Sequence, residues 1–226
     1  ERGEIQLGYA PSPTVELLPQ ALQAFQKDSP GVRVTLHDLP VQEMLQGLRE
    51  GRLDAALTVA SSSKEMSGLA FEPLRTYPFC VAVNASHRLA RAKRVNLSQL
   101  KDAHLIVYSR ADCPEYHEWL ASMFQSLGAM PEIAEEHDSA TSLIAAIEAG
   151  RGIALVASVL SSLAGSRLML REIQPSQMPL VVGVAYHRHH LGPAVRRFIK
   201  AMSLLTAGSE RLRHAAAAWW MGLRCL

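Results

Sequence analysis

Hydrophobic and polar positions follow two different periods along the opening part of the chain. Residues 4–9 alternate with the two-residue period of a strand, and residues 18–25 repeat apolar positions at helical spacing. A strand pattern at 32–38, a helix pattern at 41–51 and a strand pattern at 53–59 follow. This order predicts a βαβαβ unit built on a parallel sheet.

The same order of elements returns about a hundred residues later, as in a duplicated fold. Strand patterns at 104–109, 132–137 and 153–157 enclose helix patterns at 115–128 and 139–150. In both halves the second helix stops at a glycine and leads at once into an apolar strand. We therefore expect an α/β fold of two Rossmann-like lobes.

Two further strand patterns, at 79–83 and 180–187, are expected to cross between the lobes, and a helix pattern at 192–205 follows the second. The expected parts are lobe I at 1–83, lobe II at 84–183, a return to lobe I at 184–205 and a tail of unknown role at 206–226. Two crossover strands form a hinge, and hinge closure around a ligand in the cleft is a common response of such proteins.

Composition narrows the classes of function. A chain of 226 residues with 48% hydrophobic content can bury two modest cores. Its formal charge is +2 with Lys and Arg scattered along it, so strong DNA binding by this segment is not expected. Three cysteines at unrelated spacings favour a reducing, cytoplasmic compartment. No apolar run reaches the ~20 residues of a membrane helix, so no membrane partner is expected.

Hydroxyl side chains lie where the first strand is expected to end. Ser12 and Thr14 precede a helix whose free N–H groups can bind a small anion together with these hydroxyls. Alternatively, Thr14 caps the helix. In the second lobe, the guanidinium of Arg110 can bind an anion or pair with Asp112 at the surface.

Catalytic and metal sites are not expected. Cys113 and His117 are four residues apart, but two side chains do not complete a tetrahedral zinc site, and a thiol at a helix start with a slightly lowered pKa is the better interpretation. His187, His189 and His190 have no Cys or carboxylate beside them, which favours a solvated loop. Motifs of hydrolase nucleophiles and phosphate-binding loops are absent from the sequence. We predict no enzyme, no cofactor and no metal.

Several segments in combination resemble the effector-binding domain of LysR-type transcriptional regulators. They are Leu7-Gly8, Leu18-Pro19, Phe25, Pro30-Gly31-Val32, residues 48–54, His87-Arg88-Leu89-Ala90 and residues 150–155. The resemblance covers residues 1–205 and implies a type 2 periplasmic-binding-protein-like fold. It also implies a homodimer or homotetramer that binds promoter DNA through an N-terminal winged helix-turn-helix, which this chain lacks, so that a fragment of a longer regulator is expected.

The resemblance implies a ligand site in the inter-lobe cleft, at the ends of the strands. The expected ligand-binding residues are Ser12, Thr14, Val59, Ala60, Ser61, Ser109, Arg110, His137, Ser139, Ala157 and Ser158. His137 falls where the family places a ligand-facing side chain, although a structural histidine is the alternative. Ser139 or Asp138 is also a natural helix N-cap. The family usually has proline at Ala157 and at Arg88, so the pocket shape at Ala157 is not transferable.

The resulting prediction is an effector-binding and oligomerisation domain that senses a small, anionic metabolite. The second hypothesis is a solute-binding protein of a transport system, and the third is an enzyme with the same two-lobe fold. The family also implies an intersubunit contact between first-lobe helices around 22–25 and 44–48 and second-lobe helices around 119–124. The sequence does not identify the effector.

Overall fold

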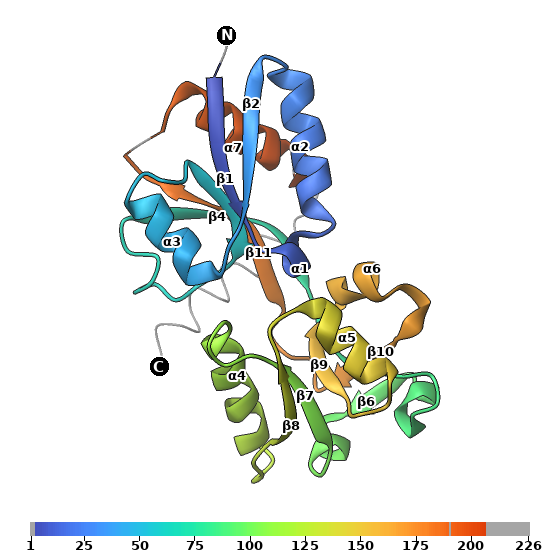
Figure 1. The fold of residues 1–226 in the computed structure, drawn as a ribbon. Helices are drawn as coiled ribbons and strands as arrows, with labels where there is room; N and C mark the ends of the chain where they lie inside the picture. The colour runs from blue at the N-terminus through green and yellow to red at the C-terminus, as the bar shows by residue number, and fades with distance from the viewer. Residues whose placement is uncertain (1–2, 190, 207–226) are drawn as a thin grey trace. The chain divides into compact units, whose positions relative to one another are not determined.

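The computed structural model describes residues 3–189 and 191–206, which belong to two compact units (Figure 1). The first unit contains the chain up to Tyr77 and the stretch that starts at Leu180, and the second runs from Pro78 to Pro179. The chain thus crosses a few residues before the expected positions 83/84 and 183/184. The reason is that the strand after Pro78 pairs entirely within the second unit's sheet, and the strand from Leu180 within the first unit's.

The first unit is built on a five-stranded sheet in the order β2-β1-β3-β11-β4. Its strands are β1 (Gly3–Tyr9), β2 (Val32–Asp38), β3 (Ala55–Val59), β4 (Leu69–Tyr77) and β11 (Leu180–His187). β1 pairs in parallel with β2 and β3, whereas β11 runs antiparallel to β3 and β4. The strand predictions for this unit are confirmed, and β4 is an additional strand.

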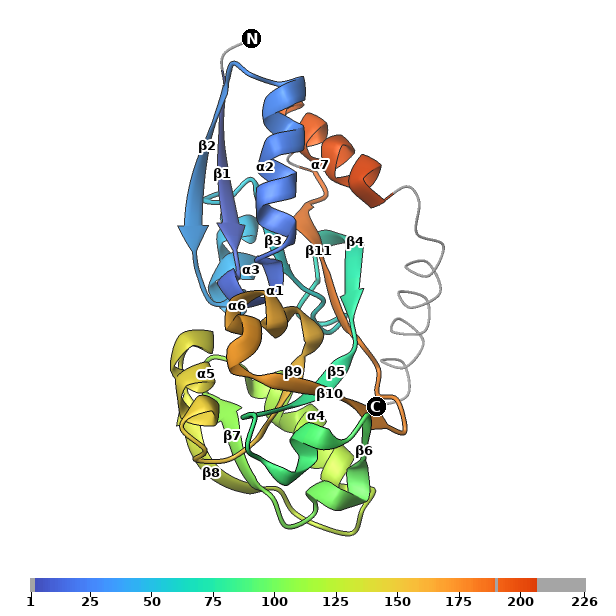
Figure 2. The same cartoon turned by 90° about the vertical axis from the view of Figure 1, so that its right-hand side faces the viewer.

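Helices cover both faces of this sheet. They are α1 (Pro11–Thr14), α2 (Leu17–Asp28), α3 (Val41–Arg49) and α7 (Pro193–Thr206). α2 and α7 pack side by side, with the rings of Phe25 and Phe198 edge to face at 5.3 Å between centroids (Figure 2). α3 covers the opposite face, where Met44 and Leu48 are fully buried.

This burial shows which side chains of the helices in the predicted intersubunit contact belong to the core. Phe25, Met44, Leu48 and Phe124 are each at most 1% exposed and pack inside their own unit. These four side chains therefore belong to the core, and pairing of subunits through the outer faces of their helices stays a prediction.

The segment at 51–54 closes the first unit's core. Gly51 adopts a φ of 71° after α3, a conformation that favours glycine. The side chain of Leu53 fills the space that Gly8 leaves, since a Cβ on Gly8 would lie 2.9 Å from Leu53 Cδ1. Asp54 accepts a hydrogen bond from the Gln6 N–H (2.8 Å) and donates its own N–H to the Gln6 carbonyl (2.9 Å). The motif therefore ties β3 to β1.

The second unit contains a four-stranded sheet in the order β6-β10-β5-β9 and a pair β7-β8. Its strands are β5 (Phe79–Val83), β6 (Arg94–Asn96), β7 (His104–Tyr108), β8 (Glu132–His137), β9 (Ala154–Ala157) and β10 (Met169–Gln174). β7 and β8 are parallel. Ile106 donates its N–H to Ile153 (2.8 Å), which in turn donates to the His104 carbonyl (3.0 Å), so the two sheets join at the start of β9.

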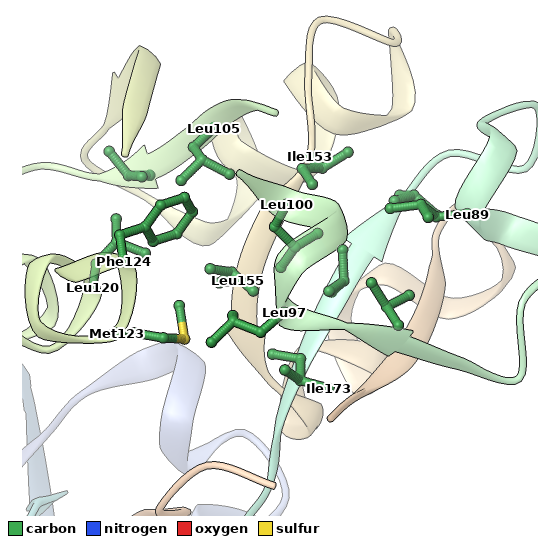
Figure 3. Packing of buried hydrophobic residues seen from close by; sticks show 14 of the residues in the cluster. Leu89, Leu97, Leu100, Leu105, Leu120, Met123, Phe124, Ile153, Leu155 and Ile173 are labelled. Atoms are coloured by element: carbon green, nitrogen blue, oxygen red, sulfur yellow. The ribbon is translucent and has the colours of Figure 1, made fainter. Parts of the chain in front are cut away.

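The helices of the second unit pack on opposite faces of these strands. They are α4 (Pro114–Gln125), α5 (Ala140–Glu148) and α6 (Ser161–Ala164), with the 3-10 helices η1 (Arg88–Arg91), η2 (Leu97–Leu100), η3 (Ser158–Leu160) and η4 (Gly165–Arg167). Leu120 and Phe124 of α4 pack with Leu105 and Leu155 in one cluster (Figure 3). α5 contributes Ile144 to a second cluster on the other face. The predicted helices of this unit are confirmed.

In the described part of the chain, no helix is long and apolar enough to cross a membrane. The predicted tail, apart from Thr206, lies outside the described residues, as do His190 and Cys225.

Candidate functional site

The first unit gathers its predicted site residues at one edge of the sheet. The parallel strands β1 and β3 end there, and α1 follows β1 directly. The Ala10 N–H donates to the Leu57 carbonyl (3.2 Å), which holds the start of α1 against the end of β3. Ser12 and Thr14 therefore lie beside residues 59–61, and we call this set the first rim.

The two hydroxyls of the first rim differ in availability. Thr14 is fully buried, and its Oγ1 donates to the Ala10 carbonyl at 2.6 Å. The N-cap of α2 is Glu16, so the alternative in which Thr14 caps that helix is wrong. Ser12 is half-buried, and no described residue forms a hydrogen bond with its hydroxyl. Ser12 is thus the hydroxyl of this rim that is open to a ligand.

Hydrogen bonds to neighbouring residues fix the position of the first rim. Ala60 donates its N–H to the Val181 carbonyl (2.9 Å), and Ser61 is 5% exposed. The loop that follows is held by Glu65, whose carboxylate accepts from the N–H (3.0 Å) and the hydroxyl (2.8 Å) of Ser62. These bonds hold residues 59–61 in a defined loop at the end of β3.

An acidic residue missed by the sequence analysis links the first rim to β4. Glu16 Oε2 accepts from Arg75 Nη1 (3.2 Å) and from the Tyr77 hydroxyl (3.0 Å). Burial raises the pKa of Tyr77 above its ordinary value, and the Glu16 carboxylate acts in the same direction. The corner between α1 and α2 is thereby tied to the last residues of β4.

The second unit brings together the ends of β7, β8 and β9, which we call the second rim. Ser109 donates its N–H to the His137 carbonyl (2.8 Å), and Arg110 donates its backbone N–H to Glu136 Oε2 (2.9 Å). The Arg110 side chain is exposed. Within the described residues its guanidinium has no carboxylate partner, and the predicted alternative of a pair with Asp112 is not formed there.

His137 lies in a chain of charged groups. Its Nε2 is 3.2 Å from Glu135 Oε2, and Arg151 Nε is 2.5 Å from Glu135 Oε1. These partners, Arg151 first, hold the pKa of the Glu135 carboxyl below its usual range. Glu135 and Arg151 were not predicted from the sequence, although Glu135 and His137 share a strand face at a spacing of two. The bond to Glu135 orients the imidazole.

Ser139, Ala157 and Ser158 each contribute to the local backbone structure of the second unit. Ser139 is the N-cap of α5, with its Oγ accepting from the Ser142 N–H (3.2 Å), which confirms the capping prediction. Ala157 has a φ of −68°, the value that proline would impose, so the backbone keeps that conformation without the ring. Ser158 donates its N–H to the Pro78 carbonyl (2.9 Å).

Cys113 departs from its predicted chemistry. Burial, assisted by the charges of Asp112 and Glu115, raises its pKa to about 11 instead of lowering it. His117 is buried with Nε2 2.6 Å from the Tyr108 carbonyl. The described residues contain no group of three or more His, Cys, Asp or Glu side chains arranged to hold a metal ion.

Residues 1–204 match the family of the LysR substrate binding domain. The chain belongs to this family. Among its LysR-type relatives is the HTH-type transcriptional regulator AlsR of Bacillus subtilis, 22% identical over 88% of this chain and 65% of AlsR. BenM of Acinetobacter baylyi is 27% identical over 67% of this chain and 50% of BenM. The chain thus spans one half to two thirds of the length of these regulators.

Solved LysR-family structures share the fold. The effector binding domain of QuiR in complex with shikimate superposes with a TM-score of 0.82 at 19% identity, covering 92% of this chain and 99% of that domain. The BenM effector binding domain with benzoate gives 0.78 at 23% identity, covering 91% and 93%. Full-length CbnR complexed with its target DNA gives 0.78 at 20% identity, covering 90% and 70%. The predicted family and the two-lobe α/β fold are confirmed.

The LysR relatives decide between the predicted functions only at a coarse level. They are transcriptional regulators and not transport receptors or enzymes, so the alternative of a solute-binding protein is not favoured. The structure brings the predicted residues together at two rims, one in each unit. Their roles in ligand binding stay predictions.

Proposed function

We propose that this LysR-family domain senses a small carboxylate effector on behalf of a DNA-binding transcriptional regulator. The domain itself performs no reaction and needs no cofactor, and the regulator works in the cytoplasm on promoter DNA. Two similar domains were solved with shikimate and with benzoate, both carboxylates, which supports this ligand class. A transcriptional role is supported by the regulators among the relatives.

The observation that carries the ligand class is the Arg110 guanidinium. It is exposed at the second rim and, among the described residues, has no acidic partner. A guanidinium binds a carboxylate through two parallel hydrogen bonds, which gives both attraction and orientation. His137 and Ser109 add donors at the same strand ends, and in the first unit Ser12 offers a hydroxyl that has no hydrogen-bond partner among the described residues.

A thermal-shift screen tests this proposal. Small carboxylic acids and their matched primary amides are added to the chain, each pair differing only in charge. A carboxylate present at about 100 times its dissociation constant should add ~2.7 kcal/mol to the unfolding free energy, and its amide should add much less. If the amides stabilise the chain as well as the acids do, the effector site does not select an anion.

We further propose that the chain forms an isologous dimer in which the α2/β2 face of one copy contacts the α4/β8 face of the other. β2 is an edge strand with Leu36 40% exposed, and a hollow of about 300 Å³ lies between it and α2. The exposed Arg33 on β2 is opposite in charge to the exposed Glu132 and Glu136 on the edge strand β8. Complementary charge on two edge strands of one chain supports pairing between copies.

The variant Leu36→Glu is expected to shift the chain from dimer to monomer. The new carboxylate would be buried without a partner in the proposed contact, which costs several kcal/mol of association free energy, on the order of a hundredfold or more in the dissociation constant. Sedimentation velocity at micromolar concentration measures the change. Leu204→Glu is the control, because Leu204 is also exposed (67%) but lies on α7. A Leu36→Glu dimer as tight as the wild type would contradict this interface.

A further inference from the structure

Basic residues are concentrated in one segment of the second unit. Residues 84–101 contain Arg88, Arg91, Lys93, Arg94 and Lys101 and no Asp or Glu. The other 18 Lys and Arg and all 21 Asp and Glu lie elsewhere, so the rest of the chain has a formal charge of −3. This corrects the expectation of scattered charge. We call residues 84–101 the basic segment.

The basic segment is anchored by its apolar residues. Leu89, Val95, Leu97 and Leu100 are at most 3% exposed and pack in the cluster that contains Phe124 (Figure 3). Both of its 3-10 helices are capped by side chains, since His87 Nδ1 accepts from the Leu89 N–H (3.2 Å) and Asn96 forms a capping box with Gln99. The cations therefore project from a well-packed support.

Most of these cations are not neutralised. Arg94 pairs with Glu172 (3.0 Å), and Arg88 Nη2 is 3.4 Å from the Gln99 carbonyl. Arg91, Lys93 and Lys101 are exposed, and among the described residues no carboxylate pairs with them. Charges on an edge strand such as β6 protect it from aggregation. That role explains Arg94 on β6 and Lys93 directly before it, but not Arg88 and Arg91, which lie on η1.

We propose that the basic segment binds the phosphate backbone of duplex DNA, without reading its sequence. Arg88 and Arg91 are one turn apart on η1, and residues at this spacing in a 3-10 helix lie on the same side, separated by about 6 Å of rise. Phosphates two nucleotides apart on one DNA strand are separated by a similar axial rise of ~6.8 Å, at about 3.4 Å per nucleotide. Among polyanions, we favour DNA for two reasons. A full-length relative was solved with its target DNA. In addition, a domain that is tethered to a DNA-bound protein meets the duplex at high effective concentration.

Fluorescence anisotropy with the 226-residue chain and a labelled duplex of arbitrary sequence tests this proposal. The triple variant Arg88→Ser/Arg91→Ser/Lys93→Ser should bind at least about tenfold more weakly at ~50 mM salt. The slope of log affinity against log salt should become shallower by about 2.7, because three phosphate contacts are lost. The control variant Lys27→Ser/Lys64→Ser/Lys200→Ser removes three exposed charges from the first unit and should keep the wild-type slope.

Three results would overturn the proposal. The first is no duplex binding by the wild-type chain at ~50 mM salt, a concentration at which phosphate contacts are strong. The second is an equal loss of affinity in the two triple variants, which would mean that only total charge matters. The third comes from competition: if polyglutamate displaces the labelled duplex at a lower charge concentration than unlabelled duplex does, the segment fits an acidic protein and not DNA.

Discussion

The Gly183→Ala variant should lose about 3 kcal/mol of unfolding free energy in the first unit, the upper part of the usual range for overpacking a core. Gly183 lies on β11 at an irregularity in its pairing with β4. A Cβ there would lie 2.3 Å from the Glu72 carbonyl oxygen and 2.6 Å from a ring atom of Phe71. The backbone of β4 would have to move, because the nearest atom is a backbone oxygen and not the end of a flexible side chain. Urea unfolding followed by circular dichroism measures the change.

Gly192→Ala is the matched control for this variant. Gly192 is exposed, and a Cβ at this position would meet no atom within 4 Å. Its unfolding free energy should stay within ~0.5 kcal/mol of the wild type. If Gly183→Ala unfolds at the wild-type urea concentration, the close approach of β4 and β11 is incorrect.

The Gly152→Ala variant should destabilise the second unit by about 2 kcal/mol, again through overpacking. A Cβ on Gly152 would lie 2.6 Å from the His104 carbonyl oxygen, which accepts the Ile153 N–H where β7 joins β9. Hydrogen exchange should therefore accelerate in β7 and β9, while β1 and β3 in the first unit keep their protection. Uniform acceleration in both units, or none in β7, would contradict this account.

The two glycines show what the sequence could and could not predict. Gly152 belongs to the segment 150–155 on which the family resemblance rests. The structure gives the physical reason for a glycine there, because a Cβ would lie 2.6 Å from the His104 carbonyl oxygen. Gly183 looked like an ordinary position in an apolar strand pattern, because the close approach of β4 depends on a neighbour more than a hundred residues away in the sequence. Local periodicity predicts that a strand exists, but not what packs against it.

The helices and strands of both units were predictable for a related reason. Elements such as α3 and β3 bury one face or both, so the spacing of their apolar residues indicates whether the segment is a helix or a strand. Short elements such as α1, β6 and the 3-10 helices have too few residues for a period to show. Met44 and Leu48, which lie in the predicted intersubunit helix, prove to be core residues, because apolar helix positions indicate burial without distinguishing a core from a contact between chains.

The candidate site was predictable at the level of strand ends but not of atoms. Parallel strands bring their carboxyl ends to one edge, which places Ser109 near His137 and Ser12 near residues 59–61. The sequence did not reveal that Thr14 would be buried with its hydroxyl donating to Ala10, or that Glu135 would hold His137. Such hydrogen bonds depend on side-chain conformations that no spacing rule specifies.

In the proposed function, Ser12 of the first rim and Arg110 of the second rim bind a carboxylate effector, and a calorimetric titration measures the contribution of each. The strongest carboxylate from the thermal-shift screen is titrated into the wild type, Ser12→Ala and Arg110→Ala, with Ser166→Ala as the control for an exposed serine elsewhere. Loss of the Ser12 bond should cost ~0.5–1.5 kcal/mol of binding free energy, and loss of the charged Arg110 bond about 1.5–3 kcal/mol. Ser166→Ala should bind as the wild type does. Unchanged affinity in both rim variants would mean that neither Ser12 nor Arg110 binds the effector and that it binds elsewhere.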